Sequence, residues 1–137
     1  MHIDQADLFE GMDREFIHGV MSLAAKEHHA KGDFIFHGGD KAKFFYLLIE
    51  GCVKISLRDD DLAVYTISNP GEAFGLSSIL DRNYYFASAS CLAPTQLFKI
   101  EGNILNQLLQ KHPSGSVFYK RMLDKLGQRL VECYKTI

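Results

Sequence analysis

Residues 69–91 read NPGEAFGLSSILDRNYYFASASC, and this stretch decides the interpretation of the whole chain. It opens with the turn Asn69-Pro70-Gly71 and then enters a short apolar run, Leu76–Leu80, that predicts one helical turn. The polar triplet Asp81-Arg82-Asn83 predicts a second turn, which leads into a strand of small residues. Because a helical turn presents unbonded N–H groups at its start, we expect this loop to be suited to an anion.

Turns rich in glycine and aspartate recur on both sides of this stretch, at steps of about 8 to 12 residues. Short runs of β-branched and aromatic residues lie between the turns. This spacing is typical of a sandwich or jelly roll and not of alternating strands and helices. The chain is therefore predicted to be mainly β, folded as a double-stranded β-helix (a jelly roll, or β-roll). The expected strands are residues 34–36, 44–49, 53–57, 62–67, 87–92 and 96–100.

Helices are expected to flank the β-roll. Apolar residues at steps of one, three and four predict an amphipathic helix over residues 13–25, which Asp13 could cap. Similar stripes predict a short helix over residues 101–112 and a long helix over residues 113–137. With the β-roll at residues 26–100, these elements make up one domain spanning residues 1–137.

The long C-terminal helix carries an apolar heptad seam. The members of the seam recur at alternating steps of three and four, which is the spacing of helices that pack against another helix. Gly127 lies inside this helix at a cost of about 1 kcal/mol relative to alanine, which is easier to understand if a second helix approaches closely. We therefore expect a homodimer formed through this helix; a single packed helix of a monomer is the alternative. The seam residues are Tyr119, Leu123, Leu126, Leu130 and Ile137, with Cys133 between the last two.

The segment Gly71-Glu72-Ala73-Phe74-Gly75 resembles the Gly-Glu-x-Phe-Gly-Glu motif of the cyclic nucleotide-binding domain family, which includes the sensor domains of catabolite-activator-like bacterial regulators. The order of turns and strands is similar from about residue 6 to the end of the chain. The resemblance implies a β-roll whose C-terminal helix pairs two subunits and closes one side of a ligand pocket. In the transcription regulators of this family a helix-turn-helix domain follows the sensor. We recognise none in this sequence and expect no direct nucleic-acid binding by this chain.

This sequence departs from the family at the ligand contacts. In the family, the second Glu of the motif holds the ribose hydroxyl, and the Arg of a following Arg-Ser/Thr-Ala segment holds the cyclic phosphate. Leu76 stands at the position of that Glu, and Tyr85 and Phe86 stand at those of the Arg and its hydroxyl neighbour. Arg82 precedes the expected Arg by three residues and could replace it only if the loop shifted. The pocket that the resemblance implies comprises Phe74, Gly75, Leu76, Ser77, Ser78, Arg82, Tyr85, Phe86, Ala87, Ser88, Cys133 and Tyr134, the last two lying nearest to the base.

These replacements lower the expected affinity for cyclic nucleotides. A charged hydrogen bond contributes about 1.5–3 kcal/mol and truncating a buried charge pair costs about 2–5, so losing both contacts removes roughly 4–8 kcal/mol. We predict that cAMP and cGMP do not bind tightly. Two functions stay open: a regulatory sensor for another small effector, apolar or aromatic, and a dimerisation or interaction scaffold whose vestigial pocket is filled by its own aromatic side chains. A haem sensor ligated by His37 or a cysteine is a minor alternative, and no cofactor is expected.

The composition is that of a single soluble domain. The 137 residues carry a formal net charge of −2, divided between residues 1–110 (9 basic against 15 acidic side chains) and residues 111–137 (6 against 2). Nucleic-acid binding calls for a denser basic patch than this. We find neither a signal peptide nor an apolar run long enough to span a bilayer, and we therefore expect a cytoplasmic protein without membrane contact.

No metal site and no catalytic residues are predicted. His28 and His29 are adjacent, but neighbours on a strand point to opposite faces and could not bind one ion together. Asp59–Asp61 are consecutive, whereas calcium loops place their ligands at alternate positions, so we interpret them as an acidic hairpin turn. Cys52 and Cys91, like Cys133, lack the spacing of a zinc or iron–sulfur site and are expected to be reduced thiols.

Overall fold

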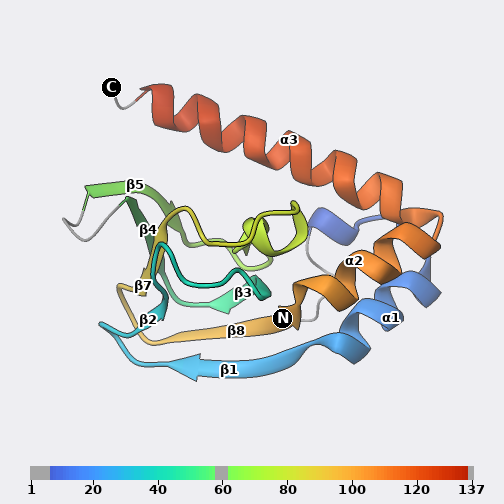
Figure 1. Ribbon diagram of the computed structural model, residues 1–137, viewed down its shortest axis with the longest axis horizontal. Coiled ribbons are helices and arrows are strands. Elements are labelled where there is room, and N and C mark those ends of the chain that lie inside the picture. Colours follow the sequence, from blue (N-terminus) through green and yellow to red (C-terminus); the bar gives the residue numbers. More distant parts are fainter. Residues whose placement is uncertain (1–6, 58–61, 136–137) are drawn as a thin grey trace.

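The chain folds as a β-roll of two antiparallel sheets, with helices at one end of the roll and along one side (Figure 1). A computed structural model describes residues 7–57 and 62–135, which include eight strands. The strands are β1 (Ala25–His29), β2 (Phe34–Phe36), β3 (Phe44–Glu50), β4 (Val53–Leu57), β5 (Leu62–Ile67), β6 (Ala73–Phe74), β7 (Ser88–Cys91) and β8 (Thr95–Glu101). The helices are α1 (Arg14–Leu23), α2 (Gly102–Lys111) and α3 (Ser114–Lys135), with the 3-10 helices η2 (Asp7–Phe9) and η3 (Leu76–Ile79).

The order of the strands defines the jelly roll. One sheet has the order β1-β8-β3-β6 and the other the order β2-β7-β4-β5, and neighbouring strands are antiparallel. Strands that lie side by side are mostly distant in the sequence, since β8 pairs with both β1 and β3. This topology confirms the predicted fold class.

Strand β3 lies between two hydrophobic cores. Phe45, Leu47 and Ile49 pack in a cluster with buried side chains of η2 and the three α-helices. Tyr46 and Leu48 point to the opposite face and pack inside the roll. Because both faces of the strand are covered, its sequence reads as a continuous apolar run without polar alternation.

The N-terminal helix ends earlier than its apolar pattern predicts. Helix α1 stops at Leu23, and Ala24 is already extended, with φ −86° and ψ 136°. Strand β1 follows at once and pairs with β8 at the edge of its sheet. Its side chains are exposed or half-buried and mostly polar, so the sequence shows no apolar pattern that would predict a strand. The backbone pairing with β8 decides the conformation.

The two C-terminal helices lie within residues 101–112 and 113–137, the ranges predicted for them. Two sequence interpretations fall outside the described residues: the acidic turn at Asp59–Asp61 and the last seam residue, Ile137.

Gly75 fixes the position of the motif loop, residues 71–75. Its φ of 72° lies in the left-handed region, and an added Cβ would come within 2.9 Å of the Phe44 carbonyl oxygen. Helix η3 starts directly after it, and η3 contacts both β3 and α2. The loop is thereby wedged between the roll and the helices.

Helix α3 lies along one side of the molecule, and its C-terminal half extends over the roll near β5 (Figure 1). In its first half, Phe118 and Met122 are buried against α2 and η2. Beyond Met122 the helix has no fully buried side chain within the described residues. A cavity separates this second half from the loop between β5 and β6.

Candidate effector site

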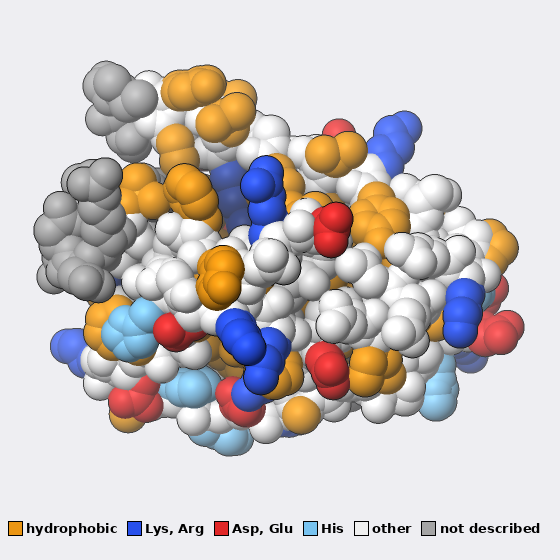
Figure 2. Space-filling view, in the orientation of Figure 1, with side chains coloured by type: hydrophobic (Ala, Val, Ile, Leu, Met, Phe, Trp, Pro, Cys, Tyr) orange, Lys and Arg blue, Asp and Glu red, His pale blue; other side chains and the backbone are white. Residues whose placement is uncertain are grey.

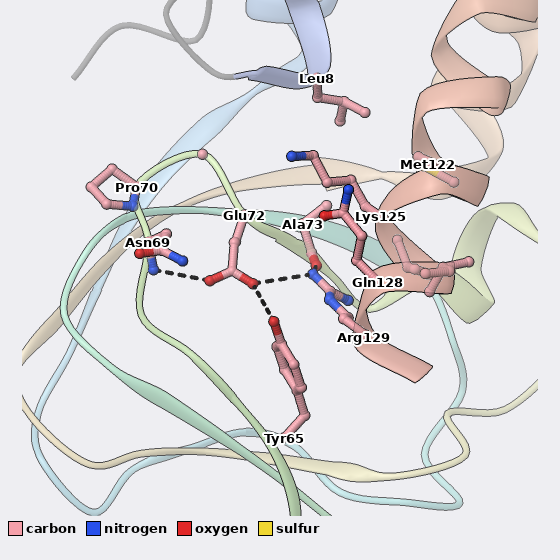
Figure 3. A pocket seen from close by; sticks show the side chains of 13 residues that line it. Leu8, Tyr65, Asn69, Pro70, Glu72, Ala73, Met122, Lys125, Gln128 and Arg129 are labelled. Atoms are coloured by element: carbon pink, nitrogen blue, oxygen red, sulfur yellow. Dashed lines mark hydrogen bonds and ion pairs between the residues drawn. The ribbon is translucent and has the colours of Figure 1, made fainter. Parts of the chain in front are cut away.

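The cavity lies between the β5–β6 loop and the middle of α3 and has a volume of about 210 Å³. Figure 3 shows its polar side chains converging from both walls, and Figure 2 shows the surface hollowed beneath α3. One wall is formed by η2, η3 and α3 and combines apolar side chains with Lys125, Gln128 and Arg129. The other is formed by β5 and the polar turn that carries the Gly-Glu motif. The lining residues are Leu8, Tyr65, Asn69, Pro70, Gly71, Glu72, Ala73, Leu76, Met122, Lys125, Leu126, Gln128 and Arg129.

Glu72 is held in place by the turn in which it lies. Its Oε1 accepts hydrogen bonds from the backbone N–H groups of Ser68 (3.1 Å) and Asn69 (3.0 Å). Its Oε2 accepts a longer hydrogen bond of 3.4 Å from the Tyr65 hydroxyl. The carboxylate therefore has a fixed orientation toward the cavity, as Figure 3 shows.

Arg129 reaches from α3 to this carboxylate. Its Nη2 lies 3.7 Å from Oε2 of Glu72 and donates a hydrogen bond to the carbonyl of Ala73. The guanidinium carbon lies 5.2 Å from the centre of the Tyr65 ring, within cation–π range. Because only 18% of the Arg129 side chain is exposed, these contacts replace most of its hydration.

Burial changes the pKa of both ionisable partners of Glu72. Burial lowers the pKa of Arg129, while the nearby Glu72 carboxylate and Tyr65 raise it in part. Burial also raises the pKa of Tyr65, as does the negative charge of Glu72. Near neutral pH Arg129 therefore remains a guanidinium and Tyr65 a neutral phenol.

The charges of the residues that line the cavity favour an anion over a cation. Arg129 and Lys125 contribute two positive charges and Glu72 contributes one negative charge. Leu76 and Leu126 add an apolar surface between these groups. An anionic group of a ligand could bind to Arg129 from the cavity, because a guanidinium binds carboxylate and phosphate with the same geometry.

The predicted pocket residues do not assemble around this cavity. Of the twelve, all of which lie in the described part of the chain, only Leu76 lines it. Leu126, predicted for the dimer seam, also lines it. Cys133 is half-buried and Tyr134 is exposed, and both lie beyond Arg129 toward the end of α3.

Tyr85, predicted to stand at the position of the phosphate-binding Arg, lies inside the roll. Its ring stacks on Phe36 with centroids 3.7 Å apart and is 5% exposed. The hydroxyl donates to the Phe44 carbonyl at 2.6 Å and accepts from the Phe44 N–H at 3.0 Å. Burial raises the pKa of Tyr85, although its hydrogen bond to the Phe44 backbone opposes this effect. An aromatic side chain of the protein thus occupies the interior of the roll.

The other predicted pocket residues have different surroundings. Phe74 is 2% exposed and packs on Tyr46 in the same aromatic cluster, whereas Phe86 is 86% exposed. Ser78 and Ser88 are buried and bonded to the frame: the Ser78 hydroxyl donates to the Gly75 carbonyl, and the Ser88 hydroxyl accepts from a backbone N–H. Ser77 and Ala87 are half-buried, and Arg82 lies in a separate hollow.

The sequence interpretation missed the Tyr65–Glu72–Arg129 network. Glu72 was recognised as part of the motif, and Arg129 was counted only as a basic residue of the last helix. A signal for Arg129 was present, because it lies seven residues after Met122 and three after Leu126, on the stripe that faces the protein. An arginine on an apolar stripe calls for a buried acceptor.

The fold and the motif loop are those of a sensor domain built on a β-roll. The sequence pattern of the Cyclic nucleotide-binding domain family matches residues 26–112. This chain belongs to that family.

Known proteins show the same relationship over most of the chain. It is 30% identical over 125 residues to the Global nitrogen regulator of Synechococcus elongatus, covering 88% of this chain and 54% of that protein. The crystal structure of the sensor domain of the transcriptional regulator DNR from Pseudomonas aeruginosa is 26% identical, with a TM-score of 0.75, covering 93% of this chain and 90% of that one. Thermus thermophilus Catabolite Activator Protein is 25% identical, with a TM-score of 0.74, over 91% of this chain and 60% of that one.

The chain spans only part of the curated relatives that it matches. A lysophospholipase of Neosartorya fischeri is 26% identical over 103 residues, which are 74% of this chain but 7% of the enzyme. The similarity to the nitrogen regulator likewise leaves nearly half of that protein unmatched. None of the helices in the described ranges combines the length and the apolar character needed to cross a membrane.

Proposed function

We propose that this domain is a non-catalytic regulatory sensor that receives a small effector in the α3 cavity and signals through α3 to a second copy of the chain. The observation that carries this proposal is the double role of one helix. Leu126 and Arg129 of α3 line the cavity, whereas Leu123 and Leu130 on another side of the helix are 68% and 52% exposed. A change at the cavity wall can therefore alter the exposed face of the same rigid element.

Cyclic AMP and cyclic GMP are poor candidates for the effector. Leu76 and Tyr85 supply neither the carboxylate nor the guanidinium that the family uses, and Tyr85 fills the roll with its ring. The cavity of about 210 Å³ is also below the range of about 300–1,000 Å³ found for small-molecule sites. A fitting effector is small, with one anionic group for Arg129 and an apolar part for Leu76 and Leu126.

The second candidate function is a scaffold with a closed pocket. The Glu72–Arg129 pair favours this function, because the Arg129 guanidinium already has partners within the protein, the Glu72 carboxylate and the Ala73 carbonyl. In that case the same α3 face would still serve for pairing, but no small molecule would change it. The two candidates differ in whether any ligand stabilises the protein in a saturable manner.

The exposed apolar stripe of α3 supports a homodimer. It consists of Leu123, Leu130, Val131 and Tyr134, each at least half exposed, and it passes over Gly127. Figure 2 shows hydrophobic side chains gathered over this half of the helix. The predicted seam is divided by the fold: Tyr119 bonds to Asn106 and Leu126 lines the cavity, so the stripe is rotated slightly from the predicted one.

Calorimetric titration and thermal unfolding test the effector proposal. We expect no heat of saturable binding with cAMP or cGMP at concentrations below about 1 mM, since roughly 4–8 kcal/mol of contacts are replaced. In a panel of small organic acids, at least one should raise the midpoint of unfolding, and Arg129→Met should abolish that rise relative to its own baseline. A cyclic nucleotide Kd in the low micromolar range would contradict the proposed chemistry. Stabilisation by none of the acids would favour the scaffold.

Light scattering tests the dimer. The substitutions Leu123→Lys and Leu130→Lys place like charges across the stripe and should convert a dimer into a monomer. Lys120→Met and Asp124→Asn, which alter charges next to the stripe, serve as controls and should leave the dimer intact. The proposal fails if the unaltered chain is monomeric or if the double lysine variant remains a dimer.

A further inference from the structure

A second hollow, of about 320 Å³, lies where the start of α2 meets two loops of the roll. It is separate from the α3 cavity, and the two share no lining residue. Its charged residues come from two different loops: Lys41 and Lys43 precede β3, and Arg82 follows η3. The proposed effector site makes no use of any of them.

The concentration of positive charge in this hollow contrasts with the rest of the domain. Residues 1–110 contain 9 basic and 15 acidic side chains, and three of the nine basic ones line this hollow. Asp81 is the one acidic residue among the lining residues, so the local net charge is +2. Residues 1–110, which are acidic overall, thus place a third of their basic side chains in one hollow, and this provides a local attraction for anions.

Backbone hydrogen bonds hold the two loops and α2 together. The Ala42 N–H donates to the Asn83 carbonyl at 2.9 Å, and Lys41 and Tyr84 form an antiparallel bridge. The Gly102 N–H donates to the Lys43 carbonyl at 2.8 Å. The backbones that carry the three cations are thus fixed relative to one another, and the hollow is not formed by independent mobile chains.

The three cationic groups have no acidic partner in the described part of the chain. Lys41, Lys43 and Arg82 make no ion pair there, whereas Arg129 and Lys99 each contact a glutamate. Asn83 and Asn103 add side-chain amides to the lining, and an amide can donate to an anion. The lining thus combines two ammonium groups, a guanidinium and neutral donors, which is the chemistry used to bind phosphate groups.

We propose that this hollow binds a small ligand carrying two or more phosphate groups. The spread of the cations over separate segments suits a ligand with several anionic groups better than a single monovalent ion. Asn106 of α2, which also lines the hollow, donates to the Ile79 carbonyl at 3.0 Å and accepts from the Tyr119 hydroxyl at 2.5 Å. A ligand in the hollow would therefore lie beside two hydrogen bonds that connect η3 to α3 through Asn106.

Isothermal calorimetry with inorganic pyrophosphate tests this site at low ionic strength, because salt at about 0.15 M screens exposed charges beyond about 8 Å. The unaltered chain should bind one pyrophosphate saturably. Lys43→Gln combined with Arg82→Gln should weaken binding at least tenfold. The matched control, Lys31→Gln with Lys111→Gln, removes two exposed lysines elsewhere and should weaken it less than twofold. Circular dichroism establishes that both variants fold.

A second arm separates free phosphate compounds from lipid headgroups. Phosphatidylcholine vesicles with and without phosphatidylinositol bisphosphate are sedimented with the same three proteins. If the protein binds only the vesicles that contain phosphatidylinositol bisphosphate, and the Lys43/Arg82 variant does not, the ligand is a lipid headgroup. If it binds pyrophosphate, the ligand is a soluble phosphate compound. Equal weakening in both variants, or no binding in either arm, overturns the proposal. Since no residue of the α3 cavity is altered, these outcomes are independent of the effector proposal.

Discussion

Tyr85 and Phe86 are neighbours in the sequence with opposite environments. The Tyr85 ring is 5% exposed and the Phe86 ring is 86% exposed. Both are predicted to stand where the family places polar ligand contacts, so the sequence alone gives them similar roles. The structure separates them, because the chain turns at this point and directs one ring into the roll and the other to solvent.

Truncation of these two aromatic residues should have very different effects. Tyr85→Ala removes a buried ring and two hydrogen bonds, and we expect the free energy of unfolding to fall by about 3–5 kcal/mol. Phe86→Ala removes an exposed ring of nearly the same size, and we expect a change within about 0.5 kcal/mol. Urea denaturation of both variants provides the comparison. Similar losses in the two variants would show that Phe86 is covered, for example by a partner.

At the scale of the element, α3 combines two faces with different neighbours. One face packs on the protein through Phe118 and Met122, and the other carries the exposed stripe around Gly127. An added Cβ at Gly127 would meet no atom of this chain within 4 Å, so packing within one chain does not explain the glycine. The proposed dimer offers a reason for the glycine, because close approach of a second helix would offset its low helix propensity.

Gly127→Ala should therefore act in opposite directions on the monomer and the dimer. In the background of Leu123→Lys and Leu130→Lys, where pairing is opposed by charge, we expect a gain of roughly 0.5–1 kcal/mol in the free energy of unfolding. In the unaltered background we expect weaker dimerisation, since the methyl group would separate the two helices. Sedimentation equilibrium measures the second effect. An undiminished dimer would place the contact elsewhere on α3.

For the whole molecule, the interior of the roll is closed by aromatic side chains, including two tyrosines. Tyr46 is 3% exposed and Tyr85 is 5% exposed. Burial raises the pKa of both phenols above the usual value, mainly because the charged form loses its hydration. The folded state therefore holds these protons more tightly than the unfolded chain does.

Alkaline pH should weaken the fold through these tyrosines. Their contribution to stability is fully present below the unfolded pKa of about 10 and is lost as the pH rises from there toward the folded pKa. The free energy of unfolding should then fall by up to about 1.4 kcal/mol per pH unit for each tyrosine. Denaturation series at several pH values measure the slope. Tyr46→Phe should reduce it, whereas Tyr84→Phe, at a 58% exposed position outside the α3 stripe, should not; equal slopes in all three proteins would contradict this account.

The sequence by itself determined the fold class and the positions of most strands along the chain. Turn residues at Gly71 and Gly75 and short apolar runs between turns are local signals, because a positive φ or a β-rich segment depends on few neighbours. The same local signals located α2 and α3. Strand β1 escaped them, since its polar residues are held by pairing with β8.

Only the tertiary structure decided which residues meet at the cavity. Tyr65, Glu72 and Arg129 are separated by up to 64 positions, and each has an ordinary role when considered alone. From the sequence alone, Glu72 is interpreted as a turn residue and Arg129 as a charged residue on a solvent-exposed helix face. Their contact depends on the angle at which α3 crosses the roll, and that angle is set by the packing of Phe118 and Met122 in the core. The split of the heptad seam into a cavity wall and an exposed stripe has the same cause, because a spacing of three and four fixes a helical face but not the neighbour that covers it.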